Sequence, residues 1–322
     1  MTYPRRNLFE PSQGGAYHCV SRCVRRAWLC GIDAYTKKSF EHRKPIVEAR
    51  IQQLGEIFAV GIHTYAVMSN HLHVVLSVAP PSAYQWPDEE VARRWLVLYP
   101  PKPTDLPTRH AELCADPARV KVQEKRIENL SRASGDRFMK SLSEPIARMA
   151  NAEDKCKGRF WEGRFKCQAL LNEKAIPAAC AYVDLNPIRT QIATSVTTSL
   201  HTGIAKRAKA IAKNSSLATQ AMRPLAGFIS ANFPQISNAE YIELVDWTGR
   251  QLHPGKRGKI AAEEPPALRK LGLDSAHWTM KVKGIGSGYW RAVGTAEELI
   301  QQAKAMGQHW LCGMGLARLM QR

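Results

Sequence analysis

Two histidines at alternate positions are the residues of this sequence whose types and spacing best suit chemistry. His71 and His73 stand within residues 64–76, TYAVMSNHLHVVL. Successive side chains of a β-strand point to opposite faces, so histidines two apart share one face, and Leu72 points to the other. Two adjacent imidazoles suit a divalent metal ion.

Two other interpretations of this pair stay open at this point. The histidines could be ordinary polar residues of a strand, or they could form the His-x-His pair that opens metal sites in unrelated hydrolases and cupins. The hydrolase pattern would continue with Asp-His two residues on. Residues 74–77 are Val-Val-Leu-Ser, which weakens that alternative.

A second candidate segment carries a tyrosine and an asparagine. Apolar residues at helical spacing predict an amphipathic helix over about residues 173–186, ending where Pro187 pushes Asn186 out of the α region. Tyr182 and Asn186 are four positions apart, so a phenol and a carboxamide share one helix face. A carboxamide oxygen can bind a hard cation, and the phenol would stand beside it. Alternatively, Tyr182 is an ordinary core or rim residue.

The order of four segments resembles that of a known family. They are YHCVSR at 17–22, the block 65–76, GRFWEGRFK at 158–166 and YVDLNPIR at 182–189. Over about residues 14–195 the chain resembles the single-tyrosine HUH transposases, and most closely the REP-associated tyrosine transposases of bacteria. The resemblance implies that His71 and His73 hold the metal, that Asn186 occupies the third ligand position and that Tyr182 is the nucleophile.

The activity that this resemblance implies is metal-dependent cleavage and rejoining of single-stranded or hairpin (REP-like) DNA through a covalent 5′-phosphotyrosine. Such chemistry needs a nucleophile aligned with the leaving oxygen and a positive charge near the phosphoryl oxygens. A tyrosine hydroxyl, with a pKa of about 10, is a poor nucleophile unless a cation or base assists it. The covalent link keeps the bond energy, which agrees with the absence of a Gly-x-x-x-x-Gly-Lys-Ser/Thr loop.

The identity of the metal follows less directly. Imidazole suits zinc, manganese, nickel and cobalt, whereas phosphate and carboxamide oxygens favour magnesium or manganese. The resemblance implies Mg²⁺ or Mn²⁺, and ligand softness leads us to expect that Mn²⁺ supports activity at least as well as Mg²⁺.

The charge balance favours a nucleic-acid partner, although a merely basic soluble protein is the alternative. Lys and Arg number 46 against 28 acidic residues, giving a formal charge of +18. Such a chain binds polyphosphate by releasing counterions. Cations interleaved with aromatic residues suit single-stranded bases, and Trp161 is the candidate for base stacking. The candidate phosphate contacts are Arg22, Arg25, Arg26, Arg159, Arg164, Lys166 and Arg189.

The predicted architecture is α+β. We expect strands at 16–22, 62–69, 71–78 and 166–171 and helices at 44–59, 122–151 and 173–186. The order βαββαβ(α) matches a ferredoxin-like arrangement plus one helix, with an antiparallel sheet whose central strand carries the histidines. The tyrosine helix can then pack across the face on which the histidines emerge.

A length of 322 residues favours two domains. We expect an HUH domain at 1–195 with a proline-rich insertion at about 79–122, a basic linker and helix at 196–235, and a mainly helical accessory region at 236–322 that could bind DNA. The insertion and the C-terminal extension lie outside the family's minimal domain. A glycine-rich piece at 281–291 lacks Gly-x-Gly-x-x-Gly spacing and is expected to be a loop without a nucleotide site.

The remaining sequence features predict a setting in the bacterial cytoplasm. There is no apolar run of about 20 residues and no apolar N-terminal signal. The eight cysteines form no Cys-x-x-Cys pair, so neither a zinc knuckle nor a disulfide framework is indicated. We expect a monomer with a complete site. A non-catalytic DNA- or RNA-binding regulator of repeat sequences is the alternative function, and the simultaneous presence of both histidines and the tyrosine favours the enzyme.

Overall fold

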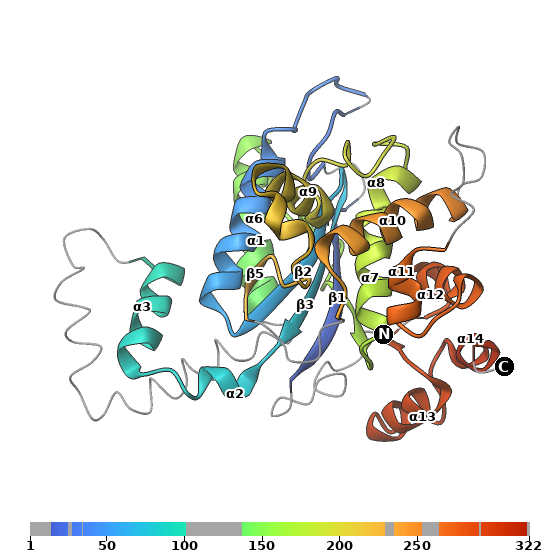
Figure 1. Ribbon diagram of the computed structural model, residues 1–322. Coiled ribbons are helices and arrows are strands. Elements are labelled where there is room, and N and C mark those ends of the chain that lie inside the picture. Colours follow the sequence, from blue (N-terminus) through green and yellow to red (C-terminus); the bar gives the residue numbers. More distant parts are fainter. Residues whose placement is uncertain are drawn as a thin grey trace.

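A computed structural model describes residues 14–24, 28–33, 35–100, 137–228, 235–252, 264–289 and 291–320. These residues form a mixed α+β structure around one six-stranded sheet in the order β5-β2-β3-β1-β4-β6 (Figure 1). Neighbouring strands are antiparallel except β4 and β6. The strands are β1 (Gly15–Arg22), β2 (Val60–Val67), β3 (His71–Val78), β4 (Lys166–Leu170), β5 (Ala226–Gly227) and β6 (Ala292–Val293).

Helices cover both faces of this sheet (Figure 1). Helix α1 (Arg43–Ile57) packs against β2 and against α6 (Arg137–Glu153) on one face. Helix α7 (Ala175–Asp184) packs against β2 and β3 on the other face. The helix predicted at 122–151 corresponds to α6, and its predicted first part lies outside the described residues.

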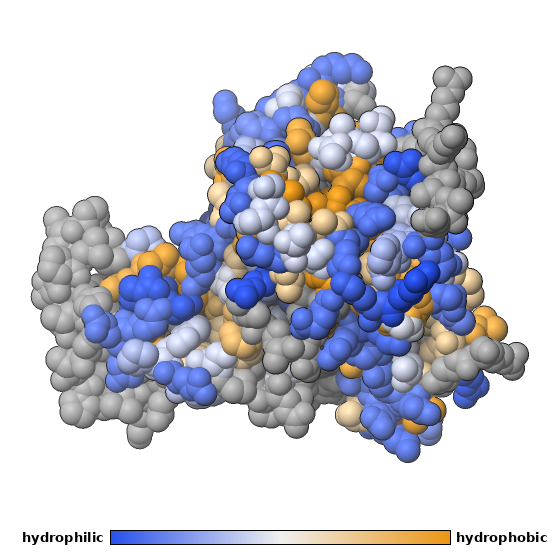
Figure 2. Space-filling model, in the orientation of Figure 1, coloured by the Kyte–Doolittle hydropathy of each residue, from blue (hydrophilic) through white to orange (hydrophobic). Residues whose placement is uncertain are grey.

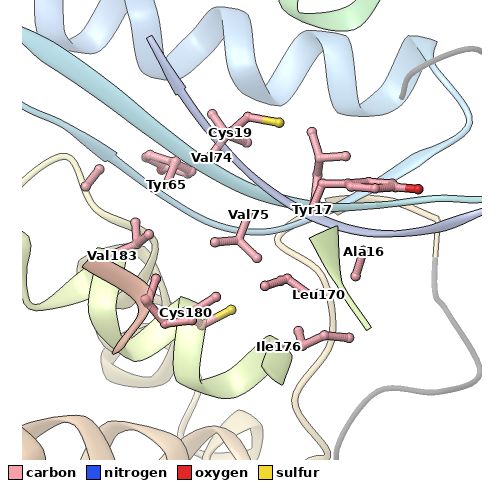
Figure 3. Close-up of a cluster of buried hydrophobic side chains, with 14 of the residues drawn as sticks. Ala16, Tyr17, Cys19, Tyr65, Val74, Val75, Leu170, Ile176, Cys180 and Val183 are labelled. Carbon is pink, nitrogen blue, oxygen red and sulfur yellow. The ribbon is translucent and has the colours of Figure 1, made fainter. Parts of the chain in front are cut away.

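Alternation along the strands decides which residues reach which helices. Figure 3 shows Cys19 of β1 on the α1 side of the sheet, and Val75 of β3 on the α7 side together with Cys180 of α7. Because side chains alternate, His18 must face α7, as must His71 and His73, which share the parity of Val75. The strand pattern of the sequence therefore directs all three imidazoles to the tyrosine helix.

Helix α7 is built mainly from small side chains and is almost entirely buried. Alanine at four of its ten positions lets its backbone approach both the sheet and α12 (Ser275–Ser287). The predicted exclusion of Asn186 from helical structure is wrong. Helix α7 ends at Asp184, and Asn186 begins the short helix α8 (Asn186–Arg189). Pro187 occupies the first turn of α8, where backbone N–H groups have no partner within the helix, so the missing N–H of proline costs no hydrogen bond.

The C-terminal part is mainly helical, as expected, and it also extends the sheet. The loop expected at 281–291 is wrong for its first part, because residues up to Ser287 belong to α12. Strand β5 pairs with β2 at one edge, and β6 pairs with β4 at the other. The fully buried Trp278 of α12 donates its indole N–H to the Thr248 hydroxyl of α10 (Asn238–Leu252), at 2.7 Å. The helices of this part are α9 (Gly203–Lys213), α10 (Asn238–Leu252), α11 (Pro266–Lys270), α12, α13 (Ala296–Ala305) and α14 (Met314–Leu319), with a 3-10 turn, η4, at Ser215–Ala218.

The segment predicted as an insertion begins with two helices, α2 (Pro80–Ala83) and α3 (Asp88–Leu98). Its residues 101–122 lie outside the described part of the chain. The predicted domain boundaries stay predictions. In the part of the chain that the structure covers, no helix has both the length and the apolar character to cross a membrane.

Figure 2 shows a largely hydrophilic face, with hydrophobic residues gathered between α9 and α10. A cavity of about 530 Å³ is found there, lined by Val196, Ile211 and Ile242 with Glu243 and Asp246. None of the candidate site residues lines this cavity, and its carboxylates would repel a phosphate.

Candidate functional site

The two histidines of β3 lie side by side on the face that α7 covers. Their ring centroids are 4.8 Å apart, and the rings are nearly perpendicular, at 79°. His73 is buried at 4% exposure, whereas His71 at the start of the strand is half-buried. The structure therefore brings the predicted pair together at one end of β3.

A hydrogen bond from the preceding turn orients His71. Its Nδ1 lies 2.7 Å from the carboxamide oxygen of Asn70. Because an oxygen of this kind can only accept, Nδ1 carries the proton, and Nε2 keeps its lone pair. Nε2 of His71 is therefore the atom that can bind a cation.

Tyr182 of α7 approaches His73 and His18 edge-on. Its ring centroid lies 6.0 Å from that of His73 and 5.8 Å from that of His18. The Arg189 guanidinium stacks on the phenol, 4.5 Å from its centroid, an attractive cation–π arrangement. The predicted nucleophile is half-buried and lies beside the imidazoles.

The phenol also packs closely on the end of α12. A Cβ atom at Gly286 would lie 2.7 Å from Tyr182 Oη and 2.6 Å from its Cε2, which is closer than real carbon contacts allow. Gly286 therefore leaves the space that the tyrosine ring occupies. The C-terminal extension forms one wall of the site.

Asn186 lies against the other ring nitrogen of His73. Its Nδ2 is 2.7 Å from His73 Nε2, and the side chain is 4% exposed. Rotation of the carboxamide exchanges its oxygen and nitrogen, so an oxygen can stand at this place when a cation is bound. His71, His73 and Asn186 thus offer two imidazole nitrogens and one amide oxygen, a donor set that suits Mn²⁺ and tolerates Mg²⁺. Within the described ranges, no three His, Cys, Asp or Glu side chains converge as a metal cluster.

Sequence reasoning missed two further residues of the site, His18 and Gln168. His18 Nε2 lies 2.9 Å from His73 Nδ1, and the two rings stack 5.2 Å apart at an interplanar angle of 12°. His18 Nδ1 lies 3.3 Å from Gln168 Oε1. The strand register places His18 of β1 opposite Gln168 of β4. The available signal was the alternation along β1, which puts His18 on the α7 face.

Burial keeps the imidazoles of the site neutral. Desolvation lowers the pKa of His18 to about 4. It also lowers the pKa of His71 to about 4, with smaller contributions from the positive charges of Arg22 and Arg189. Burial holds the pKa of His73 well below its usual value. A neutral imidazole offers the lone pair that metal binding requires.

The structure gives the candidate DNA-contact residues different surroundings. Arg22 is exposed and lies 3.7 Å from Glu162. Trp161 is partly buried against the core and donates its indole N–H to the carbonyl of Ser143 in α6, at 2.9 Å. The other candidate phosphate contacts that the structure describes are also exposed: Arg159, Arg164, Lys166 and Arg189. Arg25 and Arg26 lie outside the described residues. All these DNA contacts, including base stacking by Trp161, stay predictions.

Comparison with known proteins gives one distant likeness to report. No family model matches the chain, and no curated protein matches it. A solved structure described as "Structure of the REP associates tyrosine transposase bound to a REP hairpin" matches with a TM-score of 0.32 and 13% sequence identity, over 61% of this chain and 81% of that one. The likeness is too distant to carry a functional conclusion, so the proposed function depends on the residues of this chain.

Proposed function

We propose that this chain cleaves and rejoins single-stranded or hairpin (REP-like) DNA through Tyr182, in the manner of a single-tyrosine HUH transposase. Strands β1 to β4 with α1 and α6 would form its ferredoxin-like core. The observation that carries the proposal is the position of the Tyr182 phenol, whose ring centroid lies 6.0 Å from that of His73. Burial lowers the pKa of both His71 and His73 and so keeps the two imidazoles neutral.

In the proposed reaction Tyr182 Oη attacks the phosphorus of a phosphodiester. The bond from phosphorus to the 3′ oxygen breaks, the 3′ hydroxyl leaves with a proton, and the 5′ phosphate stays on the tyrosine. Attack by a 3′ hydroxyl on this phosphotyrosine restores the phosphodiester and frees the phenol. The Arg189 guanidinium lies over the phenol ring, from where it can contact the phosphate.

The residues that would hold the metal are His71 and His73 through Nε2 and Asn186 through its carboxamide oxygen. Both imidazoles have Nδ1 engaged, by Asn70 and His18 respectively. Nε2 is therefore the ligand atom of each, and at His73 the Asn186 carboxamide would have to turn its oxygen toward the cation. When bound, Mg²⁺ or Mn²⁺ would supply positive charge to the phosphoryl oxygens. All these side chains lie together within one chain, so a complete site would not require a partner.

A covalent adduct tests the proposal. Hairpins selected for binding from a randomised pool are labelled at either end and incubated with the protein and Mn²⁺, and the products are separated under denaturing conditions. We expect an adduct that carries the 3′ label, because the downstream fragment stays on the tyrosine. We also expect no adduct with Tyr182→Phe. An adduct that persists in this variant, or that carries only the 5′ label, would overturn the proposal. Hairpin binding with no adduct at all would favour the non-catalytic regulator.

A further inference from the structure

A continuous chain of buried polar side chains connects His73 to the backbone of helix α12. His73 Nδ1 lies 2.9 Å from His18 Nε2, and His18 Nδ1 lies 3.3 Å from Gln168 Oε1. Gln168 Nε2 then donates to the carbonyls of Ile285, at 3.3 Å, and Tyr289, at 3.1 Å. His18, His73 and Gln168 are between 4% and 6% exposed, so bulk solvent has little access to these hydrogen bonds. We name His18 and Gln168 the relay pair.

The hydrogen bonds from Gln168 to the two backbone carbonyls determine which group donates and which accepts at every other step. A backbone carbonyl can only accept a hydrogen bond, so the carbonyls of Ile285 in α12 and of Tyr289 just after it require the NH₂ group of Gln168. Gln168 Oε1 must then point to His18, where it can only accept. His18 therefore carries its proton on Nδ1 and presents the lone pair of Nε2 to His73.

The same argument fixes the protonation of His73. Because His18 Nε2 accepts, His73 must carry its proton on Nδ1, and its Nε2 keeps the lone pair. That lone pair faces Asn186, whose carboxamide lies 2.7 Å away. In the opposite orientation of Gln168, its oxygen would face two carbonyl oxygens inside the protein, and a buried unsatisfied contact of this kind is costly.

We propose that the relay pair are positioning residues, through which α12 holds His73 in the tautomer that presents Nε2 to the metal. This proposal rests on the proposed function. Metal-binding histidines generally donate their other N–H to an acceptor that fixes ring and tautomer. Here the acceptor is a neutral imidazole backed by a carboxamide, so the site gains an oriented ligand without a negative charge that would repel the DNA phosphate.

The same turn of α12 touches the nucleophile. Gly286, which packs against Tyr182, directly follows Ile285, whose carbonyl anchors Gln168. One short stretch of the C-terminal extension therefore positions both the tyrosine and a metal ligand. The extension belongs to the site as much as the histidine strand does.

The tautomers can be measured directly, without metal or DNA. Long-range ¹H–¹⁵N correlation of protein labelled at its ten histidines distinguishes the two neutral tautomers from the imidazolium. At pH 7 we expect both His18 and His73 to be protonated on Nδ1. In Gln168→Leu we expect His73 to populate the Nε2–H form. His63→Phe removes another buried histidine, from β2, and should leave both signals unchanged. An Nε2–H tautomer of His73 in the wild type, or no change in Gln168→Leu, would overturn the proposal.

The affinity for Mn²⁺ gives a second measurement that does not depend on activity. We expect His18→Phe and Gln168→Leu to weaken Mn²⁺ binding by about 10- to 100-fold in calorimetry. His18→Gln, which can still accept from His73 and donate to Gln168, should recover part of the loss. Equal affinity of all variants with an unchanged circular dichroism spectrum would contradict the relay.

The two proposals can fail separately. A wild-type protein that shows the expected tautomers and Mn²⁺ affinities but forms no DNA adduct would refute the cleavage activity and leave the relay intact. A Tyr182-dependent adduct together with unchanged tautomers in Gln168→Leu would refute the relay and leave the cleavage activity intact.

Discussion

Helix α7 carries two polar clusters that differ in how completely their hydrogen bonds are satisfied. Asp184 is fully buried, and three donors surround its carboxylate: the Thr64 hydroxyl at 2.6 Å, the backbone N–H of Ile204 at 3.1 Å and the Tyr241 hydroxyl at 2.5 Å. These donors come from β2, α9 and α10. This cluster ties the sheet and the C-terminal helices to α7, and nothing in it faces solvent.

Tyr182 precedes Asp184 by only two residues and belongs to a cluster of the other kind. The phenol and His71 are half-buried, and Arg189 is exposed. Nε2 of His71 keeps a lone pair for a ligand, and Nε2 of His73 lies 2.7 Å from the carboxamide of Asn186. Buried polar groups that are fully paired stabilise a fold, whereas oriented but unsatisfied groups at the surface are suited to bind. The contrast separates a structural cluster from a chemical one on a single helix.

The largest expected effect is the loss of DNA cleavage when one of the two histidines proposed to bind the metal is removed. We expect His71→Ala or His73→Ala to abolish DNA cleavage while hairpin affinity, measured by fluorescence anisotropy, changes by less than about threefold, because phosphate contacts elsewhere supply most of the affinity. The thermal midpoint of His71→Ala should stay close to that of the wild type, since this side chain is half-buried. Normal cleavage by both variants would show that His71 and His73 do not bind a metal that the reaction requires.

Asp184 should respond to pH through stability. Burial raises the pKa of this carboxyl to about 6, from about 4 in the unfolded chain. A raised carboxyl pKa means that the folded state gains stability as the pH falls from about 6 to about 4, and loses it as the pH rises through this window. Two pKa units correspond to about 3 kcal/mol.

Chemical denaturation of the wild type and of Asp184→Asn at several pH values measures this effect. The free energy of unfolding of the wild type, relative to the variant, should rise by up to about 3 kcal/mol between pH 7 and pH 4. A difference that is constant across this range would show that Asp184 is ionised to the same degree in both states of the wild type.

Adding a methyl group at Gly286 should slow DNA cleavage, but less than the loss of a histidine does. In Gly286→Ala the new carbon meets the Tyr182 ring, so the phenol must move away from its place beside His73. We expect cleavage to slow by about tenfold, with a loss of stability of about 1–3 kcal/mol, as is common for overpacking. Gly163→Ala is the matched control, because no atom lies within 4 Å of the position of its added carbon. Equal cleavage rates in the two variants would show that α12 does not position the tyrosine.

The smallest effect is expected for single surface cations. Arg159→Ala and Arg164→Ala should each weaken hairpin binding several-fold and lower the slope of log K against log salt by about 0.7–0.9, as the loss of one phosphate contact does. Cleavage at saturating DNA should stay unchanged. Arg93→Ala, on α3 and paired with Glu90, serves as the control. An unchanged salt slope in both variants would place the DNA path elsewhere.

Alternation and helical spacing predicted the elements around the site closely. The strand predicted at 71–78 has the bounds of β3, and the shared face of His71 and His73 follows from the period of a strand alone. The helix with Tyr182 was predicted too, although its end was placed wrongly, because Pro187 is tolerated in the first turn of a new helix.

The remainder of the site depends on pairings that local patterns do not encode. His18 and Gln168 are 150 residues apart and meet only because β1 pairs with β4 in one register. Strands β5 and β6 have two residues each, too few to show a period. The contact of Gly286 with Tyr182 likewise joins distant segments. Such contacts arise from tertiary packing, and the sequence offered no spacing that would reveal them.

The most direct test of the central claim is to locate the covalent bond. The adduct formed with a hairpin and Mn²⁺ is digested with nuclease and protease, and the modified peptide is sequenced by mass spectrometry. We predict a nucleotide attached through its 5′ phosphate to Tyr182, and to no other residue of the chain. Attachment to another tyrosine, or to a serine or histidine, would contradict the account.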